Sequence, residues 1–265
     1  SGQTDELQSF LAAFSGRHHY VFDYLAQEVV DYLPEQMQNF LLHTAILDRL
    51  CGPLCEALLD QGAADGIFSQ AILEQLEAAN LFVVPLDPHR RWYRYHHLFA
   101  SFLQARLRRE YPAEKIAELH RRACRWLEAN GYPHEAIPHA LAARDFDLSV
   151  TLIRRVTEEM FTTSQLTTLK AWLKAIPQEV ITQDLDLSMA CAWSKLATGE
   201  METIEPHLSD IERLLGAQAD GSPESMALPF NKRALLAEIS SIRATLNFNQ
   251  LNLPAVLNLC RLGQA

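Results

Sequence analysis

Apolar residues recur at helical spacing along most of this chain. In residues 4–14, for example, Leu7, Phe10, Leu11 and Phe14 occupy positions i, i+3, i+4 and i+7 of one helical face. Comparable patterns continue to the C-terminal end, interrupted by turn residues. The pattern predicts a mainly α-helical protein.

One stretch departs from this pattern and alternates instead. The segment SQAILEQLEAAN predicts a helix with Ser69 as its N-terminal cap and Asn80 at its end. It is followed by LFVVPL and RWYRYH, two runs of β-branched and aromatic residues that flank the turn DPHR. A further apolar helix, HLFASFLQARLRREY, comes next. Helices, a short hairpin and then a helix make up the element order of a winged-helix domain.

Only helices are predicted beyond Pro112. Turns near Gly131, Thr163 and Gly199 are about 34 residues apart, which is the period of tetratricopeptide-like repeats. The predicted fold class is therefore mainly α: a winged-helix domain with a small β-hairpin, then an α-helical arm and tetratricopeptide-like superhelical repeats. We expect Asp145, Asp147, Asp184 and Asp186 to cap helices, because each stands just before or at the start of a helical run.

Charge is unevenly distributed along the chain. The 265 residues carry a formal net charge of −10, which does not suit a protein dedicated to binding nucleic acid. Residues 86–125, however, contain ten Lys or Arg against four Asp or Glu, a net charge of +6. The basic stretch 90–125 therefore leaves open a nucleic-acid-binding winged-helix module. The other interpretation is a solvated helix face whose arginine stems cover apolar surface.

The helix that would enter a DNA groove argues against the first interpretation. In a DNA-reading winged helix, the helix before the wing needs cations for phosphates and polar side chains for bases. Residues 69–80 contain no Lys or Arg and carry Glu74 and Glu77. We therefore expect this module not to bind DNA directly.

Two sets of basic residues lie at the predicted hairpin. Arg90, Arg91 and Arg94 cluster on it and form a possible anion surface. His96 and His97 lie where its second strand meets the next helix. Adjacent residues do not converge on one metal ion, and the chain contains no HExxH motif. The histidines could contact an anion at the helix N-terminus or be satisfied by local backbone, and the spacing alone favours the second interpretation.

No pattern of catalytic residues is present. The sequence contains no GxxxxGK[ST], GxGxxG or GxSxG motif, so we expect no catalytic residue, no metal site and no enzymatic activity in this chain. Its five cysteines are scattered, which is typical of a reducing, cytoplasmic location. No apolar run suits a membrane span. The chain opens with SGQ and ends without a closing element, and we expect it to be a domain of a longer protein.

Several stretches resemble the middle of the large ATP-dependent transcriptional regulators of the LuxR family, the group that includes the maltose-regulon activator of enteric bacteria. These stretches are FSGRHHYVFDYLAQEVV, FLLHTAILDRLCGPLCEALL, LEAANLFVVPLD, WYRYHHLFASFLQARL, LHRRACRWLEANGYPHEAIPHALAARDF and AWLKAIP. The resemblance runs from about residue 14 to residue 200, and the residues beyond it share only the general character of the family.

The resemblance implies a domain layout and a role. Residues 1–33 would end a helical domain, 34–110 would form the winged helix, 111–160 an arm and 161–265 the start of a repeat sensor domain. Such regulators are signal-transduction ATPases that bind ATP or ADP in a domain outside this segment. The implied partners are their own nucleotide-binding and DNA-binding domains, an unknown small-molecule inducer or protein on the repeats, and further copies in the active state, with no membrane.

The resemblance also bears on the two histidines. Related switch ATPases carry a Met-His-Asp motif at the end of the winged helix, and its histidine reaches the β-phosphate of bound ADP. By this resemblance, His96 is the nucleotide-state contact, with Arg94 and His97 as possible further contacts. His97 stands where the motif has its aspartate, so the role of that aspartate is not carried over to this chain.

Overall fold

The computed structural model describes residues 24, 26–59, 67–200, 203–216 and 230–249. These residues are mainly helical, with one two-stranded antiparallel sheet among them, so the predicted fold class is confirmed. The chain divides into two compact units, one up to Arg144 and one from Asp145. The helix predicted over residues 4–14 lies outside the described residues.

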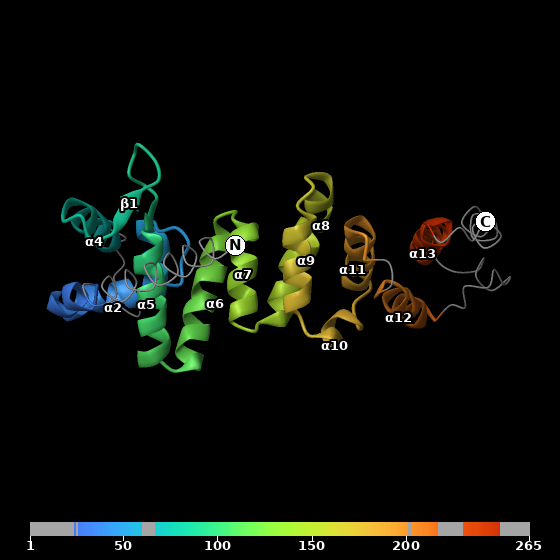
Figure 1. Ribbon diagram of the computed structural model, residues 1–265, viewed down its shortest axis with the longest axis horizontal. Helices are drawn as coiled ribbons and strands as arrows, with labels where there is room; N and C mark the ends of the chain where they lie inside the picture. The colour runs from blue at the N-terminus through green and yellow to red at the C-terminus, as the bar shows by residue number, and fades with distance from the viewer. Residues whose placement is uncertain (1–23, 25, 60–66, 201–202, 217–229, 250–265) are drawn as a thin grey trace, which may run out of the picture. The chain divides into compact units, whose positions relative to one another are not determined.

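The first unit contains a winged helix. Its elements in order are α2 (Glu35–Thr44), α3 (Gly52–Leu58), α4 (Ile67–Ala78), β1 (Val83–Pro85), β2 (Tyr93–Tyr95) and α5 (His97–Glu110). Helical residues 26–32 precede them. In Figure 1 the loop between the two strands projects beyond α5 as a wing. The hairpin and the helices on either side of it therefore form as the sequence predicted.

The sheet has one feature that the sequence did not predict. The strands β1 and β2 are antiparallel, with Val83 opposite Tyr95. Leu50 adds an isolated antiparallel bridge to Tyr93, and the N–H of each residue donates to the carbonyl of the other at 2.8 Å. Because β2 is bonded on both sides, it is the central strand of this small sheet.

Of the two ends predicted for helix α4, the C-terminal one is confirmed and the N-terminal one is not. Asn80 has a φ of 53° and stands just beyond the helix, as expected of a residue that tolerates the left-handed region. Ser69 is not a cap, and that prediction was wrong. It lies inside α4, and its hydroxyl donates to Oε2 of Glu56 at 2.7 Å, a residue of α3 that sequence periodicity could not place beside it.

Two further helices complete the first unit. They are α6 (Ala113–Ala129) and α7 (Pro133–Ala142). Gly131, with a φ of 83°, ends α6 as predicted, and the N–H of Tyr132 donates to the carbonyl of Leu127 at 2.9 Å. The helix α6 packs on both α3 and α7, so this pair of helices belongs to the same compact unit as the winged helix. The division between the units thus falls inside 111–160, and the expected domain boundaries stay a prediction.

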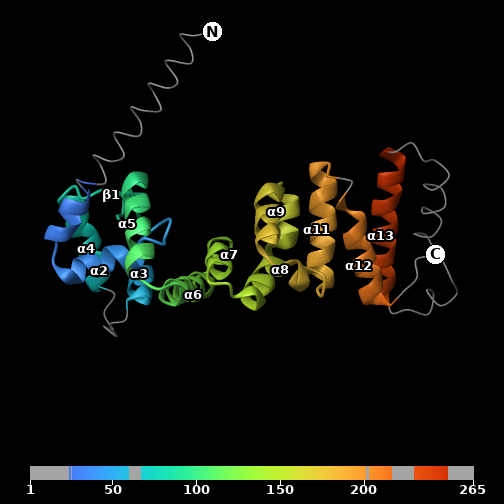
Figure 2. The same ribbon diagram turned by 60° about the horizontal axis from the view of Figure 1, so that its bottom comes forward.

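The second unit is entirely helical in its described residues. Its helices are α8 (Phe146–Thr162), α9 (Leu166–Ala175), α10 (Gln178–Ile181), α11 (Leu185–Thr198), α12 (Glu205–Leu215) and α13 (Phe230–Asn249). The helix α9 packs on α8 and α11, and α12 packs on α11 and α13, as is usual for helical repeats that bury their faces against neighbours. Figure 2 shows α11, α12 and α13 side by side.

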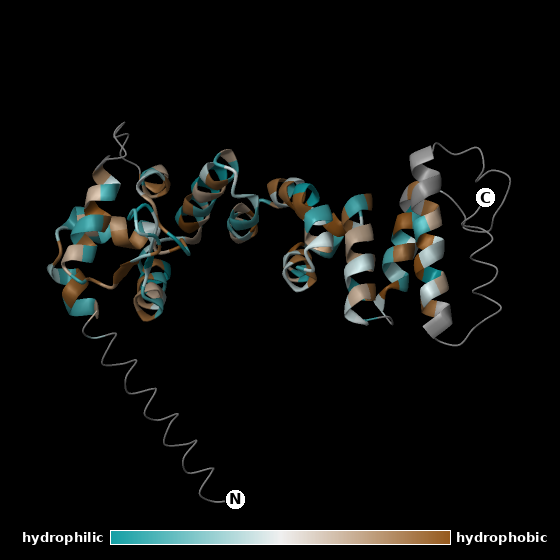
Figure 3. Ribbon diagram, turned by 90° about the horizontal axis from the view of Figure 1, so that it is seen from above, coloured by the Kyte–Doolittle hydropathy of each residue, from teal (hydrophilic) through white to brown (hydrophobic). Residues whose placement is uncertain are grey.

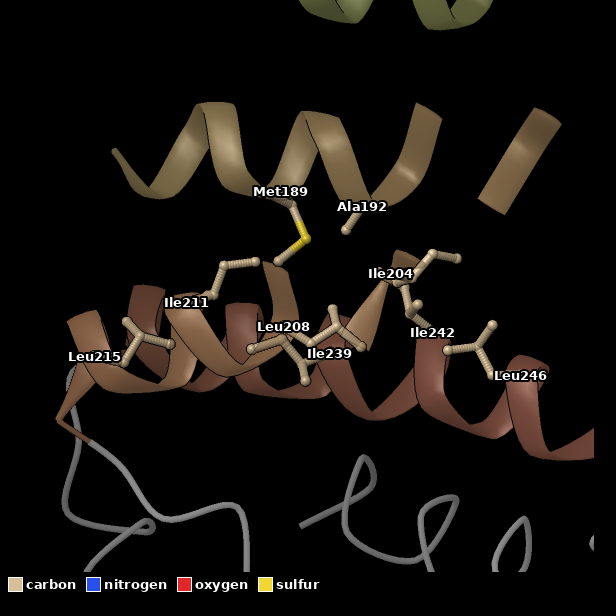
Figure 4. Close-up of a cluster of buried hydrophobic side chains, with 9 residues drawn as sticks. All are labelled: Met189, Ala192, Ile204, Leu208, Ile211, Leu215, Ile239, Ile242 and Leu246. Carbon is tan, nitrogen blue, oxygen red and sulfur yellow. The ribbon is translucent and has the colours of Figure 1, made fainter. Parts of the chain in front are cut away.

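Buried apolar residues hold these last three helices together. Figure 4 shows them meeting between the ribbons, and they comprise Met189, Ala192, Ile204, Leu208, Ile211, Leu215, Ile239, Ile242 and Leu246. Figure 3 shows hydrophilic and hydrophobic residues on different sides of individual helices, which gives each helix an apolar face to bury. None of the described helices combines the length and apolar composition needed to cross a bilayer.

Side-chain caps begin two helices of this unit. Oδ1 of Asp145 accepts from the N–H of Leu148 at 3.3 Å, and Oδ1 of Asp184 accepts from the N–H of Leu187 at 3.0 Å. Both were predicted as caps and both are confirmed. The same prediction was wrong for Asp147 and Asp186, which lie in the first turns of α8 and α11, where a negative charge still favours the helix dipole.

Candidate functional site

The strand β2 presents its residues alternately to the core and to solvent. Tyr93 and Tyr95 are buried, whereas Arg94 and the following His96 are exposed. Successive side chains of a strand point to opposite faces, so Arg94 is the exposed middle residue of β2, and the exposed His96 directly follows the strand. His96 is the N-cap residue of α5 and His97 is its first residue. The two imidazole rings lie 4.4 Å apart between centroids.

The start of α5 is open to an anion. No side chain caps it, and its first turn contains no acidic residue. The first N–H groups of a helix have no partner within the helix and form the positive end of its dipole. Two exposed imidazoles and the exposed Arg94 stand beside this end. Such a combination can bind a phosphate oxygen through main-chain and side-chain donors.

The main chain of His96 is fixed by an unusual segment. Its N–H donates to the carbonyl oxygen of Phe82 at 2.7 Å. Phe82 has a φ of 56°, a left-handed conformation that costs a residue with a Cβ atom about 1–2 kcal/mol. Its ring stacks on that of Phe99 at 4.9 Å between centroids, which holds it in place. The position of His96 is thus determined by its bond to Phe82, the residue before β1, which in turn packs on Phe99 of α5.

The wing is held by one carboxylate. Asp87 accepts hydrogen bonds from the main-chain N–H groups of Trp92 at 2.7 Å, of His89 at 2.9 Å and of Arg91 at 3.2 Å. These bonds, that from Trp92 above all, hold the pKa of Asp87 below its usual value. Because three N–H groups converge on a single side chain, the turn before β2 has a defined conformation.

The three wing arginines differ in their surroundings. Arg90 contacts Oε1 of Glu77 at 3.2 Å, and its carbonyl accepts from Nε2 of Gln70 at 3.0 Å, which ties the wing to α4. Arg91 and Arg94 are exposed, and neither forms an ion pair with another described residue. Arg94 is exposed and lies two residues before His96, so it is the wing arginine best placed to act with that residue. Anion binding by these residues stays a prediction.

The remaining cations of residues 90–125 are largely paired with carboxylates. Arg106 contacts Asp31 and Glu110, each at 2.7 Å, and Glu118 contacts Arg121 at 2.9 Å and Arg122 at 3.2 Å. Together with the tie between Arg90 and Glu77, this pairing reduces the charge available to phosphates. The geometry therefore does not favour the nucleic-acid-binding alternative.

Two surface pockets of the first unit are not lined by His96. One, of about 450 Å³, is bounded by Tyr24, Gln27 and residues of α5 that include Phe102 and Arg109. The other, of about 320 Å³, is lined by Gln36, Asn39, His43, Leu59, Phe68, Tyr111 and Lys115. Within the described part of the chain, no group of three metal-ligating side chains could hold an ion.

Sequence reasoning missed two groups of residues in the first unit. Nδ1 of His120 and Nδ1 of His139 lie 2.8 Å apart between α6 and α7. Arg49 meets Glu135 across the surface of the unit, between the rings of Trp92 and Tyr132. Neither group has a signal in the sequence, because its members come from segments that only the fold brings together.

Comparison with known proteins identifies the winged helix. Residues 26–115 match the family model described as the MalT winged helix domain. The HTH-type transcriptional regulator MalT of Vibrio campbellii is 35% identical over 178 residues, which is 66% of this chain and 19% of that protein. MalT of Yersinia pestis is 31% identical over 239 residues, which is 90% of this chain and 25% of that protein.

A relative of another kind matches over a similar span. The serine/threonine-protein kinase PknK of Mycobacterium tuberculosis is 34% identical over 225 residues, which is 82% of this chain and 20% of that protein. The chain thus spans about a fifth to a quarter of the length of these relatives. The matched segment occurs both in proteins named as regulators and in a protein named as a kinase.

Proposed function

Since this chain belongs to the MalT-like regulators of the LuxR family, we propose that it is the central relay and sensor segment of a nucleotide-dependent transcriptional activator. In this proposal the winged helix responds to ATP or ADP bound by another domain, and the helical repeats receive an inducer or a protein partner. The chain itself carries out no chemical step. Nucleotide hydrolysis, promoter binding and self-association belong to the longer protein.

The observation that carries the proposal is the exposed site at the start of α5. Arg94 is exposed on β2, the exposed His96 follows that strand as the N-cap residue of α5, and His97 begins a helix with no side-chain cap. A diphosphate that approached this end would meet helix N–H groups, two imidazoles and a guanidinium. A ligand that binds only one arrangement of the domains shifts the protein towards that arrangement. His96 would thereby favour the state that retains ADP.

The winged helix suits a relay better than DNA recognition. Glu74 and Glu77 lie on α4, the helix that enters the groove in DNA-reading members of this fold. Arg90 of the wing pairs with Glu77, so the wing contacts α4 through an ion pair. Direct DNA binding through residues 90–125 would require a duplex affinity that falls steeply with salt. We expect no binding of this kind by the chain, and its detection would revive the alternative.

The relatives support a segment that serves more than one output. A matched span is shared by proteins named as MalT regulators and by one named as a serine/threonine-protein kinase. A module that only relays a state, and does not itself read DNA or transfer phosphate, can be joined to either output.

The test is the substitution His96→Ala in the full-length protein. We expect ADP to bind at least several-fold more weakly, because a charge-assisted contact to phosphate is lost. His89→Ala is the matched control, since His89 is also an exposed histidine of the hairpin region and lies at the wing turn, away from the start of α5. Unchanged ADP affinity and unchanged basal transcription in His96→Ala would refute the proposal.

A further inference from the structure

Arg49 and Glu135 form a bidentate ion pair between two parts of the first unit. Nε of Arg49 donates to Oε2 of Glu135 at 2.6 Å, and Nη2 donates to Oε1 at 2.5 Å. The hydrogen bonds to Glu135 are the main cause that raises the pKa of Arg49 above its ordinary value. The two residues are 86 positions apart in the sequence, so this contact depends wholly on the fold.

Two aromatic rings contact the guanidinium of Arg49. The Cζ atom of Arg49 lies 3.8 Å from the centroid of the Trp92 ring and 4.7 Å from that of Tyr132. The rings of Trp92 and Tyr132 meet edge to face at 5.6 Å. The ring of Trp126 stacks on that of Tyr132 at 6.3 Å between centroids. Each ring that faces a cation adds to the attraction, so this pair is held more firmly than an ordinary surface ion pair.

The cluster lies between the sheet of the wing and the turn that joins α6 to α7. Arg49 precedes Leu50 and Trp92 precedes Tyr93, the two residues whose main chains are bonded to each other at 2.8 Å. On the other side, Tyr132 is the N-cap residue of α7 and Glu135 lies in its first turn. A carboxylate at that position also favours the dipole of α7. The cluster therefore joins the central strand β2 to the beginning of α7.

We propose that Arg49 mechanically couples α7 and the turn before it to β2, the central strand of the small sheet. We call this coupling contact the joint. In this proposal the strand β2, which ends beside His96, and the first turn of α7 move as one body through Arg49. The joint is a property of the folded unit and requires no nucleotide. It therefore stands or falls separately from the role proposed for His96.

The geometry requires arginine at this position. A guanidinium is planar, donates two parallel hydrogen bonds to one carboxylate and stacks flat on aromatic rings. A lysine could keep the positive charge but would lose the second hydrogen bond and the contact of a planar group with the rings of Trp92 and Tyr132. Arg49→Lys is thus a conservative change in charge that removes the joint.

The experiment is hydrogen exchange of the 265-residue chain in the variants Arg49→Lys and Arg49→Ala. We expect amides of residues 132–142 and of residues 92–93 to exchange roughly tenfold faster than in the unsubstituted chain. Amides of α2 and of α8 are expected to be unchanged. Arg106→Lys is the matched control, because Arg106 also joins two elements through carboxylates but has no described aromatic ring stacked on it.

A double-mutant cycle with Glu135→Gln completes the test. If the two side chains act together, the double variant should exchange more slowly than the two single effects combined would predict. Exchange that is unchanged in both Arg49 variants would overturn the proposal. So would an equal rise in every helix of the first unit, since that would indicate a general loss of stability. Equal effects of Arg49→Lys and Arg106→Lys on residues 132–142 would also overturn it.

Discussion

The main-chain N–H of His96 donates to the carbonyl oxygen of Phe82 at 2.7 Å, and Phe82 adopts a φ of 56°. His96, the N-cap residue of α5, is therefore held by Phe82, whose backbone conformation is rare for residues other than glycine. Strain of this kind persists only where surrounding contacts impose it, and it is concentrated at functional sites. Here the imposing contact is the stacking of Phe82 on Phe99.

Two substitutions of Phe82 separate strain from packing. Phe82→Ala and Phe82→Gly both remove the stacked ring, but only glycine accepts a positive φ without a steric cost. We expect both variants to be less stable than the unsubstituted chain. The glycine variant should be the more stable of the two by about 1 kcal/mol. Urea unfolding followed by circular dichroism measures this difference, and an alanine variant at least as stable as the glycine variant would contradict the strain.

The pair of His120 and His139 predicts a dependence of stability on pH. Burial lowers the pKa of each residue from 6.5 to about 4, and the neighbouring His139 contributes further for His120. Both imidazoles are therefore neutral in the folded state at neutral pH. Because the unfolded chain binds protons more readily, the contribution of the pair is present above pH 6.5 and is lost as the pH falls towards 4.

Thermal unfolding at several pH values tests this contribution. The free energy of unfolding should fall by roughly 5 kcal/mol more between pH 6.5 and pH 4 in the unsubstituted chain than in a variant with both histidines replaced by glutamine. Comparing the two chains removes the contribution of the carboxylates, which also titrate in this range. A variant that retains the full dependence on pH would show that the pair is not its source.

The cap of α8 predicts a difference between two neighbouring aspartates. The side chain of Asp145 accepts from the N–H of Leu148, whereas Asp147 lies in the first turn of the helix. Asp145→Ala should lower the free energy of unfolding by about 1 kcal/mol. Asp147→Ala should lower it by only a few tenths of a kcal/mol, since it loses an interaction with the helix dipole alone. Equal losses in the two variants, measured by urea unfolding, would contradict the assigned cap.

The buried cluster of the second unit predicts a large and local loss of stability. Leu208 of α12 is fully buried among residues of α11 and α13. Leu208→Ala should cost about 2–5 kcal/mol, because it removes apolar contacts and leaves a cavity. Hydrogen exchange should increase across α11–α13 and stay unchanged in α2–α5, which belong to the other unit. The exposed neighbour Ser209 provides the control substitution Ser209→Ala, for which we expect almost no change.

Local physical chemistry made many elements predictable from the sequence. Apolar spacing located the helices, and β-branched and aromatic residues located the hairpin. Asn80 and Gly131 marked helix ends because both tolerate a positive φ. Asp145 and Asp184 marked helix starts because their carboxylates accept from main-chain N–H groups a few residues away. Each of these features depends on residues within one or two turns of one another.

The candidate site was predicted in part. The sequence placed His96 and His97 at the junction of strand and helix, and the resemblance to LuxR-family regulators singled out His96. Only the structure showed that Arg94, His96 and His97 are all exposed and that the start of α5 has no side-chain cap. It also showed Arg90 turned to Glu77, a contact between the wing and α4 that no local pattern contains.

The helices, the hairpin and their turns can be predicted from local patterns, since spacing and conformational preference act over a few residues. Which distant side chains meet depends on the folded arrangement. It placed Ser69 beside Glu56, His120 against His139 and Arg49 against Glu135. It also added Leu50 to the sheet. Such contacts are set by how whole helices pack, and a helix with an apolar face can bury that face against many different partners.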